Sequence, residues 1–379
     1  MTLKRTPLFA AHQQLGARLV EFGGWEMPVQ YTSIMDEHQA VRTAAGLFDI
    51  SHMGEVWVTG AEAANFLNAT LTNSVSKLVP GQAQYSLLCN ERGGVVDDLY
   101  LYRVGKETFL LIINASRIEP DMEWLRARHA AFPQREAVLM GDVSSEYGAV
   151  AVQGPRVVEF IDQCFPAAGL IKTARPTQLQ KNEVDIFTFG GRDAFVARTG
   201  YTGEDGFEVV TAADNIESVW NRLLEAGRPF GLKPTGLGAR DTLRTEACLP
   251  LYGHELDENT TPIEAGLGFF VALDKGEFTG RTMLAEQKAK GVSKKCVAFK
   301  MADKSPPPRP HYPIWSTGPD SKKIGEVASG TQSPSLGIGL GLAYLPAELA
   351  QLDAAIEVEI RGRRSPAVIV RRPFYKRQT

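Results

Sequence analysis

The sequence predicts an α+β fold with two interleaved α/β sandwich-type domains and a C-terminal antiparallel β-barrel. First, strands and helices alternate through residues 1–285, and hairpin turns between strands indicate antiparallel pairing rather than a doubly wound parallel sheet. Second, residues 294–379 are rich in short strands, glycine and proline, and lack a long helix. Third, 379 residues can form two or three hydrophobic cores. Residues 1–285 are therefore predicted to form the two interleaved domains, discontinuous in sequence, and residues 286–379 the barrel.

The N-terminal third predicts helices and strands in turn. Thr6-Pro7 starts a helix whose apolar residues recur at helical spacing as far as Phe22, and Gly23-Gly24 ends it. A second helix is expected from Ile34 to Ala45, with Gly46 as its stop signal. The elements expected next are a strand over 47–59 interrupted at Gly54, a helix over 61–71, a strand over 84–89, a hairpin of 95–104 with 108–114, and a helix over 116–131.

The same alternation continues towards the C-terminus. The expected elements are strands within 137–152, a helix over 155–165, a hairpin of 184–189 with 193–198, a strand over 207–211, a helix over 216–224 and a helix over 282–289. Ser305-Pro306-Pro307-Pro308 is interpreted as a stiff loop in the barrel region.

Composition excludes several classes of protein. A net charge of −3 argues against a non-specific nucleic-acid binder. The four cysteines are far apart and the six histidines do not cluster, so no metal site is expected. The longest apolar stretch is only strand-sized, which predicts no membrane association through a spanning segment. Without a recognisable signal or transit peptide, the expected location is the cytoplasm.

The segment Gly93–Arg103 places acids in a predicted strand. Successive side chains in a strand point to opposite faces, so Asp98, Tyr100 and Tyr102 share one face while Asp97 lies on the other. A carboxylate followed by two aromatic rings suits a flat, nitrogen-rich ligand. The alternative is an acid exposed at the end of a strand.

Two further segments carry unusual residues. Arg198–Glu208 holds three glycines, which indicates tight bends or close approach, and its acids and lack of lysine disfavour phosphate binding. Glu208 could instead protect a strand edge. In Gly236–Glu246, a glycine turn enters a helix, where Arg240 could bind a carboxylate or ring carbonyl. The alternative is a salt-bridged surface helix, with an ion pair between Asp241 and Arg244.

Two more segments are interpreted as structural. Ser51 and His52 are sequence neighbours and would lie on opposite faces of an extended chain, so a nucleophilic triad is not expected and a packed inter-domain turn is. Leu251–Glu255 follows the helix that contains Arg240 and is also expected to serve the fold.

These motifs together resemble the T-protein family of the glycine cleavage system. The resemblance extends from Thr6 to the Pro373-Phe374-Tyr375 tail, with the motifs in the family's order. The segments that carry it are Thr6–Leu8, Gly24–Pro28, Tyr31, Phe48–Glu55, Gly93–Leu99, Gln153–Pro155, Arg198–Glu208, Gly236–Arg244 and Leu251–Gly253.

The resemblance implies a fold, an activity and a set of site residues. The domains are expected to surround a central folate channel, and the implied enzyme is an aminomethyltransferase with lipoylated H-protein as its partner. Asp98 matches the family's essential carboxylate, Glu208 its pterin-facing acid and Arg240 its folate-contacting arginine. Tyr85, Asn114 and Tyr201 match positions that line the folate site.

The implied reaction is transfer of the one-carbon unit of an aminomethyl group from the dihydrolipoyl arm to tetrahydrofolate, with release of ammonia and formation of methylenetetrahydrofolate. Asp98 is expected to orient the folate and stabilise positive charge rather than act as a base, because an unperturbed aspartate has a pKa of about 3.9. Two alternatives on the same fold are a folate-dependent demethylase and a non-catalytic folate-binding protein.

Overall fold

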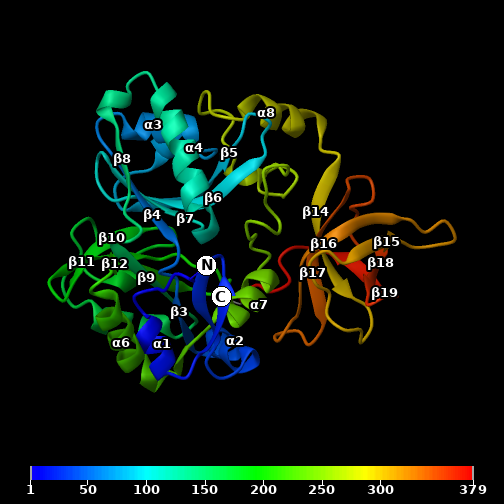
Figure 1. The fold of residues 1–379 in the computed structure, drawn as a ribbon, viewed down its shortest axis with the longest axis horizontal. Coiled ribbons are helices and arrows are strands. Elements are labelled where there is room, and N and C mark those ends of the chain that lie inside the picture. The colour runs from blue at the N-terminus through cyan, green and yellow to red at the C-terminus, as the bar shows by residue number, and fades with distance from the viewer. Residues whose placement is uncertain (1, 378–379) are drawn as a thin grey trace. The chain divides into compact units, whose positions relative to one another are not determined.

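The computed structural model describes residues 2–377 (Figure 1). The chain divides into two compact units. The first, here called unit 1, comprises the chain up to Leu88 with residues 97–240 and 275–278. The second, unit 2, comprises residues 89–96 and 241–274 and the chain from Thr279 onward.

Unit 1 is built on two large sheets. The six-stranded sheet has the order β10-β11-β12-β9-β3-β13, and all its pairs are antiparallel except β13 with β3. The five-stranded sheet has the order β5-β6-β7-β4-β8. The first sheet comprises β3 (Ala45–Asp49), β9 (Tyr147–Gln153), β10 (Val184–Phe189), β11 (Arg192–Ala197), β12 (Gly206–Ala212) and β13 (Leu232–Pro234). The second comprises β4 (Gly54–Thr59), β5 (Gln82–Cys89), β6 (Val95–Arg103), β7 (Thr108–Ile113) and β8 (Leu139–Asp142).

The two sheets are interleaved in sequence, because every strand of the five-stranded sheet falls between β3 and β9. They pack on each other through Trp57 of β4, whose ring contacts Tyr147 of β9 and Phe195 of β11 at centroid distances of 6.4 and 5.5 Å. The α+β architecture predicted from the alternation of hairpins and helices is therefore confirmed.

Helices cover the outer faces of the sheets in unit 1. Leu8, α1 (Phe9–Gln14), α5 (Ile161–Cys164) and α6 (Ile216–Gly227) share one hydrophobic core with the six-stranded sheet. Helices α3 (Ala63–Thr70) and α4 (Ile118–Ala131) lie side by side on the five-stranded sheet (Figure 1). Helix α2 (Ile34–Thr43) precedes β3, to which it packs.

Unit 2 contains a closed barrel of antiparallel strands in the order β14-β17-β16-β15-β18-β19. Alternate residues of these strands fill a separate hydrophobic core around Phe299 and Ile314. The strands are β14 (Lys294–Met301), β15 (Pro313–Ser316), β16 (Lys323–Gln332), β17 (Gly339–Pro346), β18 (Ala355–Ile360) and β19 (Arg363–Val370), preceded by α8 (Arg281–Lys290). This confirms the predicted C-terminal barrel.

Two predicted helices are wrong. The helix expected to continue to Phe22 ends with α1, because Gly16 has a φ of +69°, and β1 (Arg18–Phe22) pairs with β2 (Trp25–Gln30). Gly23 and Gly24 form the intervening turn with φ of +57° and +85°, a region that favours glycine. The helix expected over 155–165 is reduced to a short 3₁₀ turn and α5.

The remaining elements are short or lie near the junctions of the units. They are α7 (Leu237–Glu246) and the 3₁₀ helices Val75–Lys77, Ala115–Arg117, Arg135–Ala137, Val157–Glu159, Pro176–Gln178, Arg228–Phe230 and Gly268–Phe270. Within residues 2–377, none of the helices combines the length and apolar character needed to cross a bilayer.

Replacing Lys275 by methionine is expected to destabilise the protein by about 2 kcal/mol. The Lys275 ammonium group donates to the carbonyl oxygens of Asn68 (2.6 Å) in the last turn of α3, of Leu71 at its C-cap and of Asn73 (2.9 Å) beyond it. Carbonyl groups in the last turn of a helix have no partner within the helix. Methionine keeps the aliphatic packing but removes these donors. Urea unfolding of the Lys275→Met and Lys106→Met variants tests this expectation, because Lys106 is highly exposed. Equal stability of the two variants would contradict it.

Candidate active site

Strand β6 presents the alternation that the sequence predicts. Asp97, Leu99 and Leu101 are buried on one face of the strand, and Leu99 and Leu101 are at most 3% exposed. Asp98 and Tyr100 are half-buried on the other face. Asp98 therefore lies within a central part of a sheet in unit 1 and is not an acid exposed at the end of a strand.

Both carboxylate oxygens of Asp98 accept hydrogen bonds from predicted site residues. The Tyr85 hydroxyl of β5 donates to Asp98 Oδ2 (2.8 Å), and Asn114 Nδ2 donates to Asp98 Oδ1 (3.0 Å). Asn114 directly follows β7, so three neighbouring strands supply these groups. The arrangement fixes the carboxylate in one orientation.

The environment of Asp98 raises its pKa to about 7. Burial is the main cause and the negative charge of Asp97 adds to it, while the hydrogen bonds from Tyr85 and Asn114 oppose the shift. The expectation that Asp98 is too weak a base at neutral pH assumed an unperturbed pKa, and that assumption is wrong. A carboxylate with a pKa near 7 is suited to accept a proton as well as to orient a substrate.

A row of tyrosines connects Asp98 with Glu208. The Tyr85 ring meets Tyr100 edge to face at a centroid distance of 6.0 Å, and Tyr100 stacks on Tyr102 at 6.1 Å. The Tyr102 hydroxyl donates to Glu208 Oε2 (3.2 Å), although Tyr102 is on the five-stranded sheet and Glu208 on β12 of the other. The two acids thus lie at opposite ends of one aromatic wall between the two sheets of unit 1.

Glu208 keeps one oxygen available. Its Oε2 accepts from the Thr199 hydroxyl (2.6 Å) in addition to Tyr102, whereas Oε1 accepts no hydrogen bond from the residues in the range 2–377. Glu208 is half-buried and paired on both sides, with Ala197 of β11 and Ala151 of β9, so it does not protect a strand edge. An acceptor oxygen is thereby presented by a fixed side chain.

The glycine-containing loop that carries Tyr201 is held by side chains beneath it. Gln153 Nε2 donates to the carbonyl oxygen of Thr199 (3.0 Å), and the Thr202 hydroxyl donates to Gln153 Oε1 (3.0 Å). A Cβ at Gly200 would lie 1.9 Å from Gln153 Oε1, so a larger residue there would displace the Gln153 amide that holds the loop. The glycines predicted to make a tight loop therefore position Tyr201.

Arg240 and Tyr201 contact each other within unit 1. The Arg240 guanidinium carbon lies 4.6 Å from the centre of the Tyr201 ring, in a cation–π arrangement. Tyr201 in turn is close enough to Tyr85 to raise the pKa of the Tyr85 hydroxyl, after the larger effects of burial and of Asp98. The structure therefore brings together all six predicted site residues, which are Asp98, Tyr85, Asn114, Tyr201, Glu208 and Arg240.

Ser51 and His52 do not form a nucleophilic triad. Ser51 Oγ donates to the carbonyl oxygen of Ala149 (3.0 Å), and both side chains are buried. Burial lowers the pKa of His52 to about 4, and the positive charge of Arg240 lowers it further against the opposing effect of Asp49. His52 is therefore a neutral imidazole near the site at neutral pH.

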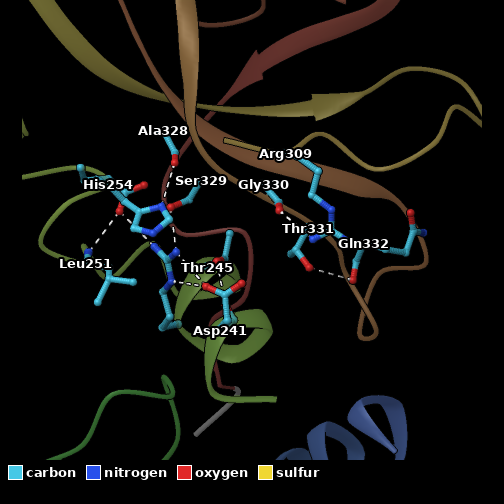
Figure 2. Close-up of polar contacts among 12 residues, drawn as sticks. Asp241, Thr245, Leu251, His254, Arg309, Ala328, Ser329, Gly330, Thr331 and Gln332 are labelled. Atoms are coloured by element: carbon cyan, nitrogen blue, oxygen red, sulfur yellow. Dashed lines mark hydrogen bonds and ion pairs between the residues drawn. The ribbon is translucent and has the colours of Figure 1, made fainter. Parts of the chain in front are cut away.

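The helix after Arg240 makes structural contacts in unit 2. Arg244 is 2% exposed and pairs with Asp241 (2.8 Å) and Glu255 (3.0 Å), and it donates to the Ser329 hydroxyl (2.7 Å). Figure 2 shows Asp241 and Ser329 in this cluster, with His254 Nδ1 3.1 Å from the carbonyl oxygen of Ala328. The pair of Asp241 and Arg244 is confirmed: the Arg244 side chain is buried, whereas that of Asp241 is 47% exposed.

Several residues of the site were not predicted as site residues. Thr199 bonds Glu208, and Asp121 of α4 lies under β6 against Asp97. In the sequence, Asp121 resembles any other acid in the first turn of a helix, where acids are common. The burial of Asp121 that marks it as unusual is visible only in the structure.

The fold and the site define a two-sheet enzyme unit joined to a barrel, and known proteins share this architecture. The family model described as the GCVT N-terminal domain matches residues 8–275, and that of the glycine cleavage T-protein C-terminal barrel domain matches residues 294–376. The crystal structure of glycine cleavage system aminomethyltransferase T from Bartonella henselae has a TM-score of 0.89 and 32% identity, covering 99% of this chain and 98% of its own.

Proteins related in sequence align with the whole length of this chain. An aminomethyltransferase of Bacillus mycoides is 48% identical over 384 aligned positions, and one of Bacillus cytotoxicus is 47% identical; each alignment covers 100% of this chain and 99% of the relative. The chain belongs to the glycine cleavage T-protein family, whose enzymes are aminomethyltransferases. The family predicted from the motifs is confirmed.

Proposed function

We propose that this protein transfers the one-carbon unit of the aminomethyl group on the dihydrolipoyl arm of lipoylated H-protein to tetrahydrofolate, releasing ammonia and forming methylenetetrahydrofolate. The observation that carries the proposal is the half-buried Asp98 carboxylate, oriented by Tyr85 and Asn114, at one end of a tyrosine wall. Membership of the aminomethyltransferase family over the full chain supports it.

The residues between the two acids fit a reduced pterin. A pterin presents an amino group and a ring N–H side by side, and Glu208 Oε1 is an acceptor that no group in residues 2–377 occupies. The rings of Tyr100 and Tyr85 offer flat apolar surface between Glu208 and Asp98. Arg240, stacked on Tyr201, supplies a cation suited to a ring carbonyl or a carboxylate of the folate.

Asp98 would act on the reacting end of the folate. In the overall reaction the carbon–nitrogen and carbon–sulfur bonds of the aminomethyl group break and two bonds to folate nitrogens form. The two protons that leave those nitrogens end on ammonia and on the dihydrolipoyl sulfur. An ionised Asp98 stabilises positive charge on the transferred carbon and orients the attacking nitrogen. With its pKa raised to about 7, it can also accept the proton that this nitrogen loses.

The proposal also includes the domain boundaries and the cellular location of the protein. We place the two interleaved folate-binding domains in residues 1–285 and the barrel in residues 286–379. The interleaving of the two sheets in sequence supports this division. A cytoplasmic location and the absence of nucleic-acid or membrane partners stay predictions from the sequence.

A demethylase or a non-catalytic folate binder is less well supported. Relatives at 48% identity over the full chain are named aminomethyltransferases, and the Asp98 carboxylate is present and oriented. The discriminating experiment measures ammonia release from aminomethylated H-protein with and without tetrahydrofolate. Folate-stimulated release supports the proposal, and binding of folate without release would contradict it.

The activity is expected to rise with pH on its acid side, with an apparent pKa of about 7 in kcat/KM. The sign follows from the requirement for the ionised carboxylate, because the fraction of ionised Asp98 falls as the pH drops through a pKa of about 7. A profile measured between pH 5.5 and 9 with ammonia as the product tests it. A flat profile down to pH 5.5 would indicate that Asp98 does not titrate in this range.

A further inference from the structure

Behind the Asp98 carboxylate, on the opposite face of the five-stranded sheet, lies a second pair of acids. Asp97 of β6 and Asp121 of α4 both have 0% exposure. Within residues 2–377, no N–H or O–H group donates to either oxygen of Asp121, and Arg117 Nε is 3.7 Å from Asp121 Oδ1, beyond hydrogen-bond distance. A buried carboxylate in this position needs another way to satisfy its oxygens.

Asp121 and Asp97 satisfy each other by sharing a proton. The hydrogen bond between their side chains lowers the pKa of Asp97 and raises that of Asp121, as expected for a donor at Asp121 and an acceptor at Asp97. Two ionised carboxylates in a buried contact would repel strongly, so one of them must be protonated. Burial raises the pKa of Asp97, but the hydrogen bonds that it accepts from the backbone N–H of Asn114 (3.0 Å) and from Asn114 Nδ2 (2.8 Å) oppose this shift and favour its ionised form, whereas Asp121 has no such donors within residues 2–377. The proton therefore belongs to Asp121.

Asn114 transmits this arrangement to the other face of the sheet. Its single Nδ2 group donates to Asp97 Oδ1 (2.8 Å), to the Asp98 carbonyl oxygen (3.1 Å) and to Asp98 Oδ1 (3.0 Å). The orientation of the Asn114 amide is thus set by an ionised Asp97 on one side and used by Asp98 on the other. A change in the charge of Asp97 must affect Asp98.

We propose that Asp121 is a positioning residue for the transfer reaction, which acts on the Asp98 carboxylate through Asp97 and Asn114. The inference rests on the proposed function for its catalytic consequence. Asp121 itself contacts no substrate-facing group of the site; its proton keeps Asp97 ionised, and the ionised Asp97 fixes Asn114 and lies next to Asp98.

The charged groups around Asp121 are consistent with this assignment. Asp97 and Asp98 of β6 both favour its protonated form, and burial favours it most, which raises the pKa of Asp121 to about 11. Arg117, at the start of α4, opposes the shift. The charge of Asp97 in turn raises the pKa of Asp98. At neutral pH Asp121 is therefore protonated and Asp97 ionised, and Asp98 titrates near pH 7.

The experiment compares Asp121→Ala with Asp121→Asn. Alanine removes the donor, so Asp97 should take up the proton itself and no longer repel charge on Asp98; the acid limb of kcat/KM is expected to move down by about one pH unit. The kcat should fall about tenfold with little change in the KM for tetrahydrofolate. Asparagine retains an N–H donor to Asp97, so the acid limb of kcat/KM in the Asp121→Asn variant is expected to stay near pH 7. Glu123→Ala, an exposed acid on the same helix, is the matched control.

A readout without catalysis separates this inference from the proposed function. In the free protein with ¹³C-labelled aspartate, the Asp98 carboxyl should titrate near pH 7 in the Asp121→Asn variant and about one unit lower in the Asp121→Ala variant. Infrared spectra at pH 8 should show a protonated carboxyl band that disappears in Asp121→Asn. The inference is overturned if that band is unchanged, or if alanine and asparagine move the Asp98 titration equally. These results do not depend on whether the protein transfers one-carbon units.

Discussion

The Asp98→Asn variant is expected to lose 10²- to 10⁴-fold in kcat for ammonia release, the range typical of groups that transfer protons or stabilise developing charge. The amide is nearly isosteric with the carboxylate, so it can still accept from Asn114 and hydrogen-bond with Tyr85. It can neither take a proton nor carry negative charge. The KM for tetrahydrofolate should change by only a few-fold, because Glu208 and the tyrosine wall remain.

The same substitution is expected to make the protein more stable at pH 8. Burial raises the pKa of Asp98 to about 7, above its unfolded value, so the ionised side chain costs folding free energy above pH 7 and little below the unfolded pKa of about 3.9. Allowing for partial solvent exposure, asparagine should add about 1–2 kcal/mol to the free energy of unfolding at pH 8.

Single-turnover kinetics with aminomethylated H-protein and urea unfolding measure the two effects of Asp98→Asn. Asp193→Asn is the control, because Asp193 is an exposed acid of the same unit and is not one of the six site residues. Turnover within a factor of three of the parent protein would remove Asp98 from the mechanism. A loss of stability together with activity would show that the variant is damaged rather than chemically disabled.

The Glu208→Gln variant is expected to bind tetrahydrofolate about 10- to 100-fold more weakly. Hydrogen bonds to a charged group contribute about 1.5–3 kcal/mol, and the amide replaces one acceptor oxygen with a donor that would face the N–H groups of the pterin. Thr199 and Tyr102 would retain a partner on the remaining oxygen. At saturating folate, kcat should fall much less than in Asp98→Asn.

Calorimetric titration of tetrahydrofolate into the Glu208→Gln variant tests this expectation directly. Glu217→Gln, an exposed position on α6 of the same unit, controls for the loss of one negative charge. An unchanged dissociation constant for Glu208→Gln would place the pterin elsewhere. A large loss of kcat at saturating folate would instead assign Glu208 to the chemical step.

The sequence was most informative where residue type and strand alternation acted together. The alternation along β6 was sufficient to separate Asp98 from Asp97, and the glycines before Glu208 correctly indicated a tight loop. Local signals failed at β1, because the spacing of Leu15, Leu19 and Phe22 is compatible with a helix as well as with a short strand. The decisive constraint there is the left-handed Gly16.

Contacts between segments that are far apart in sequence could not be predicted from residue types and strand alternation. The bond from Tyr102 to Glu208 joins residues 106 positions apart, and it exists only because the two interleaved sheets face each other. The pairing of Asp121 with Asp97 likewise depends on how α4 packs under β6. The family resemblance predicted the six site residues and the alternation along β6 indicated Asp97, Tyr100 and Tyr102, but neither indicated Asp121 or Thr199.

A crystal structure of the protein with bound tetrahydrofolate tests the central claim most directly. The account predicts that the pterin lies along the rings of Tyr85 and Tyr100, with its amino group and ring N–H on Glu208. The Asp98 carboxylate should then face the nitrogen atoms that receive the one-carbon unit. A folate bound away from this wall, or an Asp98 carboxylate turned to bulk solvent in the complex, would contradict the account.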